Sequence, residues 1–134
     1  MNILLAESSD FNPRALELLR TLGAVRQEDL SGVALCGAVG DCDVLWVRLR
    51  NYIGAEVMDA APRLKWIVSP TTGLNHIDLE AAEKRGIRIL SLRGQADFLK
   101  EIRATAELTI GLMLALLRRI PAAAWDVREG GWNR

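Results

Sequence analysis

Short apolar runs alternate with segments in which apolar and polar residues recur at helical spacing. The apolar runs are rich in aliphatic and β-branched residues, which is typical of buried strands, and the segments between them are typical of amphipathic helices. The predicted strands are residues 2–7, 24–29, 43–49, 64–69 and 87–92. The predicted helices are residues 12–23, 54–62 and 78–86, with a weaker, glycine-containing candidate over 30–40.

Two of these helices have clear boundary signals. Asn12 is suited to cap a helix, Pro13 fits the first helical position, and Gly23 is suited to end it. Asp78 and Gly86 bound the last of these helices in the same way.

The alternation of strands and helices predicts an α/β fold: a flavodoxin-like, doubly wound, five-stranded parallel sheet. Strand 24–29 is polar enough for an edge position, whereas strand 43–49 is apolar enough for the centre. Ligands of such sheets bind beyond the carboxyl ends of the strands. We therefore look for binding residues directly after the predicted strands.

The pattern changes at Ile102. A long C-terminal helix is predicted over residues 102–120, with Pro121 as its boundary or kink. This helix is apolar on nearly all sides, so it needs to be buried on more than one side, by a second domain, a second subunit or both. We divide the chain into a lobe of residues 1–101 and a helix and tail of residues 102–134.

Composition and charge exclude several classes of protein. The 17 basic and 17 acidic residues cancel, which argues against a nucleic-acid-binding protein. The longest apolar stretch, residues 108–117, is about half of the roughly 20 residues that span a membrane. The apolar segment at the amino terminus is too short for a signal peptide, and an acidic residue follows it too soon. Cys36 and Cys42 are expected to be buried or half-buried free thiols without zinc partners, and we expect a soluble, cytoplasmic protein.

The segment that follows the fourth predicted strand has the composition of an anion-binding turn. It reads SPTTGLNHID over residues 69–78. Gly73 would allow a positive φ angle and the close approach of a ligand, successive backbone N–H groups could bind a carboxylate or phosphate, and Thr71 and Thr72 add hydroxyls. Arg48 ends the strand before it and could pair with the same anion. The alternatives are an ordinary turn, which is the more common use of such residues, and a surface arginine.

The single histidine and the tryptophans give weaker signals. His76 has no carboxylate at the spacing of a catalytic triad, so we expect a surface or capping role. Trp46 and Trp66 lie in predicted strands and are expected in the core. Trp125 and Trp132 lie in the tail, where exposed aromatic side chains more often mark an interface.

Nearly the whole chain resembles the NAD-dependent D-isomer-specific 2-hydroxyacid dehydrogenases, and within them D-3-phosphoglycerate dehydrogenases. The resemblance is carried, in order, by the strand DVLWVRL, the loop PTTG, IDLEAAEKRGI, ATAELT and GGW. It implies a substrate-binding lobe beside a Rossmann lobe, with a crossing and dimerisation helix. By position, Arg48 would help to hold the acidic group of the substrate, and Thr72 and Gly73 match the loop whose backbone amides would bind the 2-hydroxy or 2-keto carboxylate. Thr71 is a further substrate-binding candidate through its hydroxyl. Thr72 would also lie close to NAD.

The sequence departs from the family pattern in two ways. Pro70 and Thr71 replace the usual alanine and glycine of the loop, and Asn75 stands where the family often has aspartate. No GxGxxG motif follows a strand, and the family's catalytic arginine, glutamate and histidine belong to the Rossmann lobe. His76 does not match that histidine. We therefore expect no catalytic residue in this chain, no NAD bound by it alone and no turnover without a Rossmann lobe.

Several partners and rival functions remain. The resemblance implies a homodimer through residues 102–120, or a separate Rossmann lobe as partner. A receiver domain is disfavoured because Arg48 stands where that class needs an aspartate, and a flavin module lacks the aromatic residues that flank the ring. A non-enzymatic anion-binding or dimerising regulatory module stays as the alternative.

Overall fold

The structure, a computed structural model, describes residues 1–132. The chain divides into two compact units, Met1–Gly94 and Gln95–Arg134, which are described separately.

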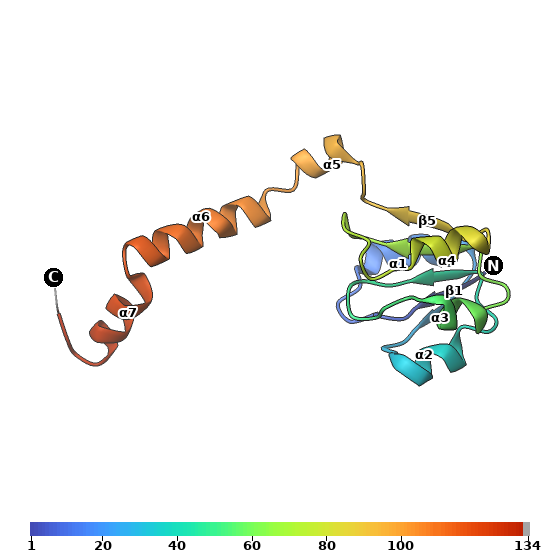
Figure 1. Ribbon diagram of the computed structural model, residues 1–134. Helices are drawn as coiled ribbons and strands as arrows, with labels where there is room; N and C mark the ends of the chain where they lie inside the picture. Colours follow the sequence, from blue (N-terminus) through green and yellow to red (C-terminus); the bar gives the residue numbers. More distant parts are fainter. Residues whose placement is uncertain (133–134) are drawn as a thin grey trace. The chain divides into compact units, whose positions relative to one another are not determined.

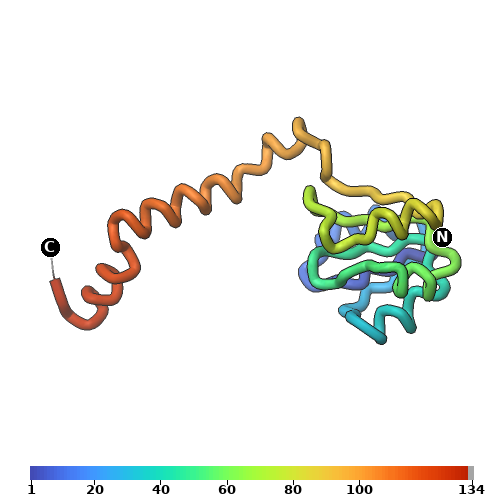
Figure 2. The backbone as a smooth tube through the Cα atoms, in the orientation of Figure 1, coloured from blue at the N-terminus to red at the C-terminus, as the bar shows by residue number. Residues whose placement is uncertain are grey.

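The first unit is built on one parallel sheet (Figure 1; Figure 2). Its strands are β1 (Asn2–Leu5), β2 (Ala24–Gln27), β3 (Val44–Trp46), β4 (Trp66–Ser69) and β5 (Arg88–Ser91). Their spatial order is β2-β1-β3-β4-β5, with every neighbouring pair parallel. The flavodoxin-like sheet is thus confirmed, with β2 at an edge and β3 in the centre. Each strand is shorter than its apolar run because the runs extend into the loops beyond the ladder.

Four helices connect these strands: α1 (Pro13–Leu22), α2 (Gly32–Ala38), α3 (Ala55–Asp59) and α4 (Leu79–Lys84). The side chain of Asn12 accepts hydrogen bonds from the backbone N–H groups of Arg14 and Ala15 and so caps α1. Asp78 caps α4 by accepting from the N–H of Ala81 at 2.9 Å. Gly86 follows α4 with a φ of 67°, a left-handed conformation that favours glycine.

The helices cover the two faces of the sheet separately (Figure 1). Helix α1 packs Leu16 and Leu19 on one face, against Ile3, Leu5 and Trp46. Helices α2, α3 and α4 cover the other face, where the larger core lies. Its fully buried side chains include Leu4, Leu35, Leu45, Ile53 and Ile67.

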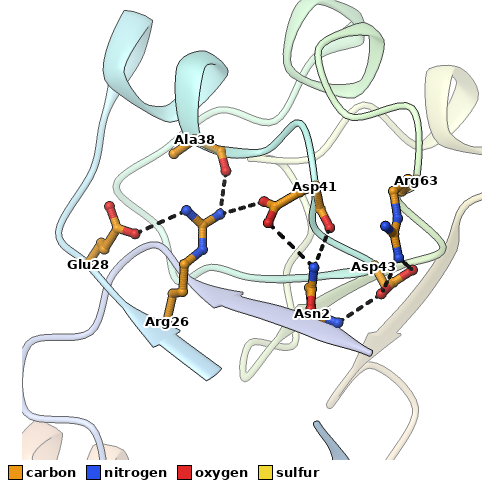
Figure 3. A network of polar contacts seen from close by, with 7 residues as sticks. All are labelled: Asn2, Arg26, Glu28, Ala38, Asp41, Asp43 and Arg63. Carbon is orange, nitrogen blue, oxygen red and sulfur yellow. Dashed lines mark hydrogen bonds and ion pairs between the residues drawn. The ribbon is translucent and has the colours of Figure 1, made fainter. Parts of the chain in front are cut away.

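A polar network closes the amino-terminal edge of the sheet (Figure 3). The carboxylate of Asp43 is buried and accepts a hydrogen bond from the backbone N–H of Asn2 at 2.8 Å, with Arg63 and Lys65 at 3.4 and 3.6 Å. The hydrogen bond from the N–H of Asn2, and after it the charge of Arg63, hold the pKa of Asp43 below its usual value, although desolvation of the carboxylate acts in the opposite direction. Because all strands are parallel, this network and the loops that follow the strands lie at opposite edges.

The second unit contains α5 (Ala96–Lys100), α6 (Ala104–Leu117) and α7 (Ile120–Arg128). The sequence did not predict α5. The long C-terminal helix predicted over 102–120 is present as α6 with shorter bounds: it ends at Leu117, and Arg119 has a positive φ of 51° just before α7. The break thus lies slightly before Pro121, the predicted boundary or kink. Pro121 lies in the first turn of α7, where its missing N–H costs nothing.

No side chain of α6 is buried among the described residues, and Met113 and Leu116 are 57% and 77% exposed. No single helix in residues 1–132 is long and apolar enough to cross a membrane; the segments Ala96–Leu117 and Ile120–Arg128, bent by 62°, pass that test only as a pair.

The tryptophans follow the sequence expectation in part. Trp46 is buried, and Trp125 and Trp132 are exposed as expected. Trp66 is only half-buried, and the guanidinium of Arg88 stacks on its ring with 3.7 Å between Cζ and the centroid. Cys36 is half-buried and Cys42 is buried, as the sequence predicted.

Candidate functional site

The loop between β4 and α4 is held in place by three of its own carbonyl groups. The carbonyl of Thr71 accepts from the N–H of Leu92 at 3.1 Å, and that of Leu74 accepts from the N–H of Ile77 at 2.9 Å. The carbonyl of Gly73 accepts from the hydroxyl of Thr71 at 2.7 Å. These bonds fix the orientation of three peptide planes at the carboxyl edge of the sheet.

The N–H groups of the same three planes have no hydrogen-bond partner among residues 1–132. In a trans peptide the N–H points opposite to the carbonyl of the preceding residue, so the N–H groups of Thr72, Leu74 and Asn75 point away from those anchors. None of them donates a hydrogen bond to any residue that the structure describes. Three N–H groups within four residues are therefore available to hydrogen-bond an anion.

Gly73 has no structural reason to be glycine within the described chain. The expectation of a positive φ is wrong: the glycines with positive φ are Gly32, Gly86, Gly94 and Gly130. A Cβ added to Gly73 would meet nothing within 4 Å. The space above this glycine is therefore open within the described chain, which leaves the backbone accessible to a ligand.

The loop borders an open hollow of about 420 Å³. Its lining comes from the loop, the start of α4 and the segment after β5: Thr72, Gly73, Leu74, Asn75, Ile77, Leu79 and Arg93. The side chains of Thr72 and Arg93 make no hydrogen bond or ion pair with the described residues. Sequence reasoning missed Arg93, although it follows a strand at the carboxyl edge as Arg48 does.

Arg48 and Arg50 differ in what they contact. The guanidinium of Arg50 donates to the carbonyl of Ala6 and pairs with Asp29, both at 3.2 Å, so it ties neighbouring loops together. Arg48 is half-buried and lies over the ring of Trp46, with 5.4 Å between Cζ and the centroid. Stacking leaves the guanidinium edge available for hydrogen bonds. Arg48 is not among the residues that line the hollow.

Among the remaining loop residues, His76 differs from the sequence expectation. His76 is buried rather than on the surface, and its Nε2 atom lies 3.0 Å from the hydroxyl of Ser69. Asn75 is exposed at the hollow. Pro70 precedes all three outward N–H groups, so its missing donor removes none of them.

Comparisons with known proteins agree with one another. Residues 3–113 match the model of the family described as "D-isomer specific 2-hydroxyacid dehydrogenase, catalytic domain". The sequence is 37% identical over 133 residues to a glyoxylate reductase of Thermofilum pendens, covering 99% of this chain and 33% of that protein. It is 31% identical over 134 residues to the D-3-phosphoglycerate dehydrogenase of Homo sapiens, covering 98% of this chain and 24% of that protein.

A solved structure extends this likeness to the fold. The crystal structure of the TT0316 protein from Thermus thermophilus is 36% identical, with a TM-score of 0.84, over 100% of this chain and 42% of that one. The chain thus spans between about a quarter and a third of the length of the two curated relatives. On the combined match of sequence and fold, this chain belongs to the D-isomer specific 2-hydroxyacid dehydrogenase family.

Proposed function

We propose that this chain is the substrate-binding portion of an NAD-dependent oxidoreductase that acts on the CH–OH group of a small, phosphoglycerate-like D-2-hydroxy acid. Family membership supports the reaction class. The observation that carries the proposal is that the loop carbonyls of Thr71, Gly73 and Leu74 accept hydrogen bonds, whereas the N–H groups of Thr72, Leu74 and Asn75 donate none to the described residues. The substrate carboxylate would accept hydrogen bonds from these groups, and Arg48 would add a charge-assisted bond.

The two threonines take different roles in this proposal. The hydroxyl of Thr71 already bonds Ser69 and Gly73, so Thr71 holds the loop in shape. The hydroxyl of Thr72 is unpaired within residues 1–132 and lies at the hollow, so it is the one available to substrate and cofactor. Gly73 contributes the open space above its backbone.

The residues present would contact part of NAD, but they would not form a complete NAD-binding site. Thr72 offers an exposed hydroxyl next to the carboxylate-binding amides, while the sequence has no GxGxxG motif after a strand. NAD would supply the hydride acceptor for the substrate carbon. A Rossmann lobe, on the same polypeptide or a separate one, would hold most of the cofactor. On this proposal the 134-residue chain alone has no turnover.

Arg93 supports a substrate with a second anionic group. Arg93 lines the same hollow as Thr72 and Gly73, and its guanidinium has no partner among the described residues, so a phosphate or second carboxylate bound there would meet a cation. This favours phosphoglycerate-like acids over glyoxylate, which has a single carboxylate.

The exposed apolar helix α6 supports a protein partner. An exposed apolar surface of this kind is normally covered by another polypeptide. We propose that residues 102–120 pair with a second copy of the chain or pack on a Rossmann lobe. The same observation favours the alternative, a non-enzymatic anion-binding or dimerising regulatory module. The free thiols of Cys36 and Cys42 suit a cytoplasmic location.

An NMR titration of the chain with D-3-phosphoglycerate tests the proposed function. We expect the backbone amide resonances of Thr72, Leu74 and Asn75 to shift together, with one common dissociation constant. Glycerol 3-phosphate, which lacks the carboxylate, should shift them much less. Equal shifts with both compounds, or no shift in these amides, would contradict a carboxylate site in this loop.

A further inference from the structure

A chain of hydrogen bonds runs from the interior of the first unit to the anion-binding loop. The Nε2 atom of His76 lies 3.0 Å from the Oγ of Ser69. That Oγ lies 2.9 Å from the Oγ1 of Thr71, which in turn lies 2.7 Å from the carbonyl oxygen of Gly73. Ser69 and His76 are only 1% and 8% exposed, so water does not easily replace the contact between them, whereas the bond from Thr71 to Gly73 is exposed.

The donor and acceptor of each hydrogen bond in this series follow from its last acceptor, the carbonyl of Gly73. A carbonyl oxygen can only accept, so Thr71 must donate its single hydroxyl hydrogen to Gly73. The Thr71 oxygen then has to accept from Ser69, which uses the only hydroxyl hydrogen of Ser69. The Ser69 oxygen must therefore accept from His76, and the imidazole carries its hydrogen on Nε2. The Nδ1 atom is buried and has no partner among the described residues.

The backbone of His76 is anchored independently of its ring. Its carbonyl accepts from the N–H of Ile53 at 2.8 Å, and the carbonyl of Ile53 accepts from the N–H of Asp78 at 3.0 Å. Ile53 is fully buried in the loop that follows β3. The imidazole thus projects from a fixed point, so it can hold Ser69 and Thr71 in one orientation.

We propose that His76 is a positioning residue for anion binding, although it does not touch the anion. Through Ser69 and Thr71 it fixes the carbonyl of Gly73, and the planarity of that peptide directs the N–H of Leu74 outward. This inference rests on the proposed function, because the loop matters here as a binding site. The alternative is a histidine that only fills space in the interior, and it makes different predictions.

The tautomer of His76 tests the hydrogen-bond chain directly. The ¹⁵N spectrum of the histidine-labelled chain, recorded at a pH at which an imidazole is neutral, distinguishes a protonated Nε2 from a protonated Nδ1. We expect the hydrogen on Nε2. A ring protonated on Nδ1 would require the opposite order of donors and would overturn the inference.

Two substitutions separate positioning from space filling. In His76→Gln the terminal amide can still donate to Ser69, whereas His76→Met fills a similar volume without a donor. We expect His76→Gln to keep the wild-type amide shift of Leu74 and the wild-type affinity for D-3-phosphoglycerate. His76→Met should shift that amide and weaken binding by about tenfold, the effect of losing one buried hydrogen bond.

Urea unfolding of both variants confirms that each is folded under the conditions of the titration. Equal affinities and equal Leu74 shifts in the two variants would show that His76 only fills space. If the wild-type chain does not bind D-3-phosphoglycerate at all, the proposed function fails. The tautomer and the Leu74 shift then still decide whether His76 orients the loop.

Discussion

The Oγ1 atom of Thr71 lies 2.7 Å from the carbonyl oxygen of Gly73, so a side chain of the loop fixes the loop's own backbone. Thr71→Val keeps the shape of the side chain but removes this bond. We expect Thr71→Val to lower the affinity for D-3-phosphoglycerate by about tenfold, because the Leu74 N–H loses its fixed direction. Thr71→Ser retains a hydroxyl and should bind nearly as wild type. Isothermal titration calorimetry of the three proteins measures this; equal affinity of Thr71→Val and wild type would contradict it.

Arg93 should determine selectivity between acids rather than binding in general. We expect Arg93→Gln to weaken binding of D-3-phosphoglycerate by at most about fivefold, because an exposed ion pair contributes about 1 kcal/mol or less. Binding of D-lactate, which has no second anionic group, should stay the same. Arg93→Lys keeps the charge and serves as the control. An equal loss for both acids would assign Arg93 to the carboxylate instead.

The stability of the first unit should fall at acidic pH, in part through Asp43. Its folded-state pKa is lower than its usual value of 3.8, because the N–H of Asn2 and the nearby Arg63 favour the carboxylate. The stabilisation is therefore complete above the unfolded pKa and is lost as the pH falls through the lower, folded pKa. Asp29 has a lowered pKa too, chiefly through a hydrogen bond from Ser9.

Asp43→Asn isolates the contribution of Asp43 from that of Asp29. We expect the urea midpoint of the wild type to fall more between neutral pH and about pH 3 than that of Asp43→Asn, because the amide has no charge to lose. Unfolding curves of both proteins at the two pH values provide the measurement. Parallel decreases would show that Asp43 does not contribute.

If the chain forms a homodimer, we expect the apolar surface of α6 to form the dimer interface. Met113 is half exposed on that helix, and Met113→Asp would bury an unpaired charge in the interface. We expect sedimentation to show a concentration-dependent dimer for the wild type and a monomer for Met113→Asp, with Met113→Leu behaving as wild type. A wild type that is monomeric at all concentrations would contradict the homodimer. A Rossmann lobe would then remain as the proposed partner that packs on α6.

The sequence predicts the sheet well because most strands have an apolar run, the more polar β2 suits an edge, and α1 and α4 have clear boundary residues. Asn12 and Asp78 are caps that act within a few residues, so local reading finds them. His76 was misjudged because its burial depends on Ser69 and on the backbone of Ile53, and no periodicity marks a loop residue. The sequence places the break at Pro121 rather than after Leu117, because arginines at 118 and 119 suit a helix and only Pro121 signals the change.

The candidate site was predicted as a set of residue types but not as a geometry. The composition of PTTG indicated an anion site, yet the reason given for Gly73, a positive φ, is wrong. Which carbonyls are anchored depends on Leu92 and Ile77, partners that the loop sequence does not reveal. Arg93 carried the same signal as Arg48, a cation at the carboxyl end of a strand, and could have been found by applying that rule to every strand.

The most direct test of the central claim is calorimetric binding of D-3-phosphoglycerate to Gly73→Ala, with Gly37→Ala as the matched control. A Cβ would meet nothing within 4 Å at either position, and neither glycine has a positive φ, so both variants should fold. We expect Gly37→Ala, in α2, to bind as wild type and Gly73→Ala to bind at least about tenfold more weakly, because its methyl group occupies the ligand's space. Equal affinities in the two variants would contradict an anion site on this loop.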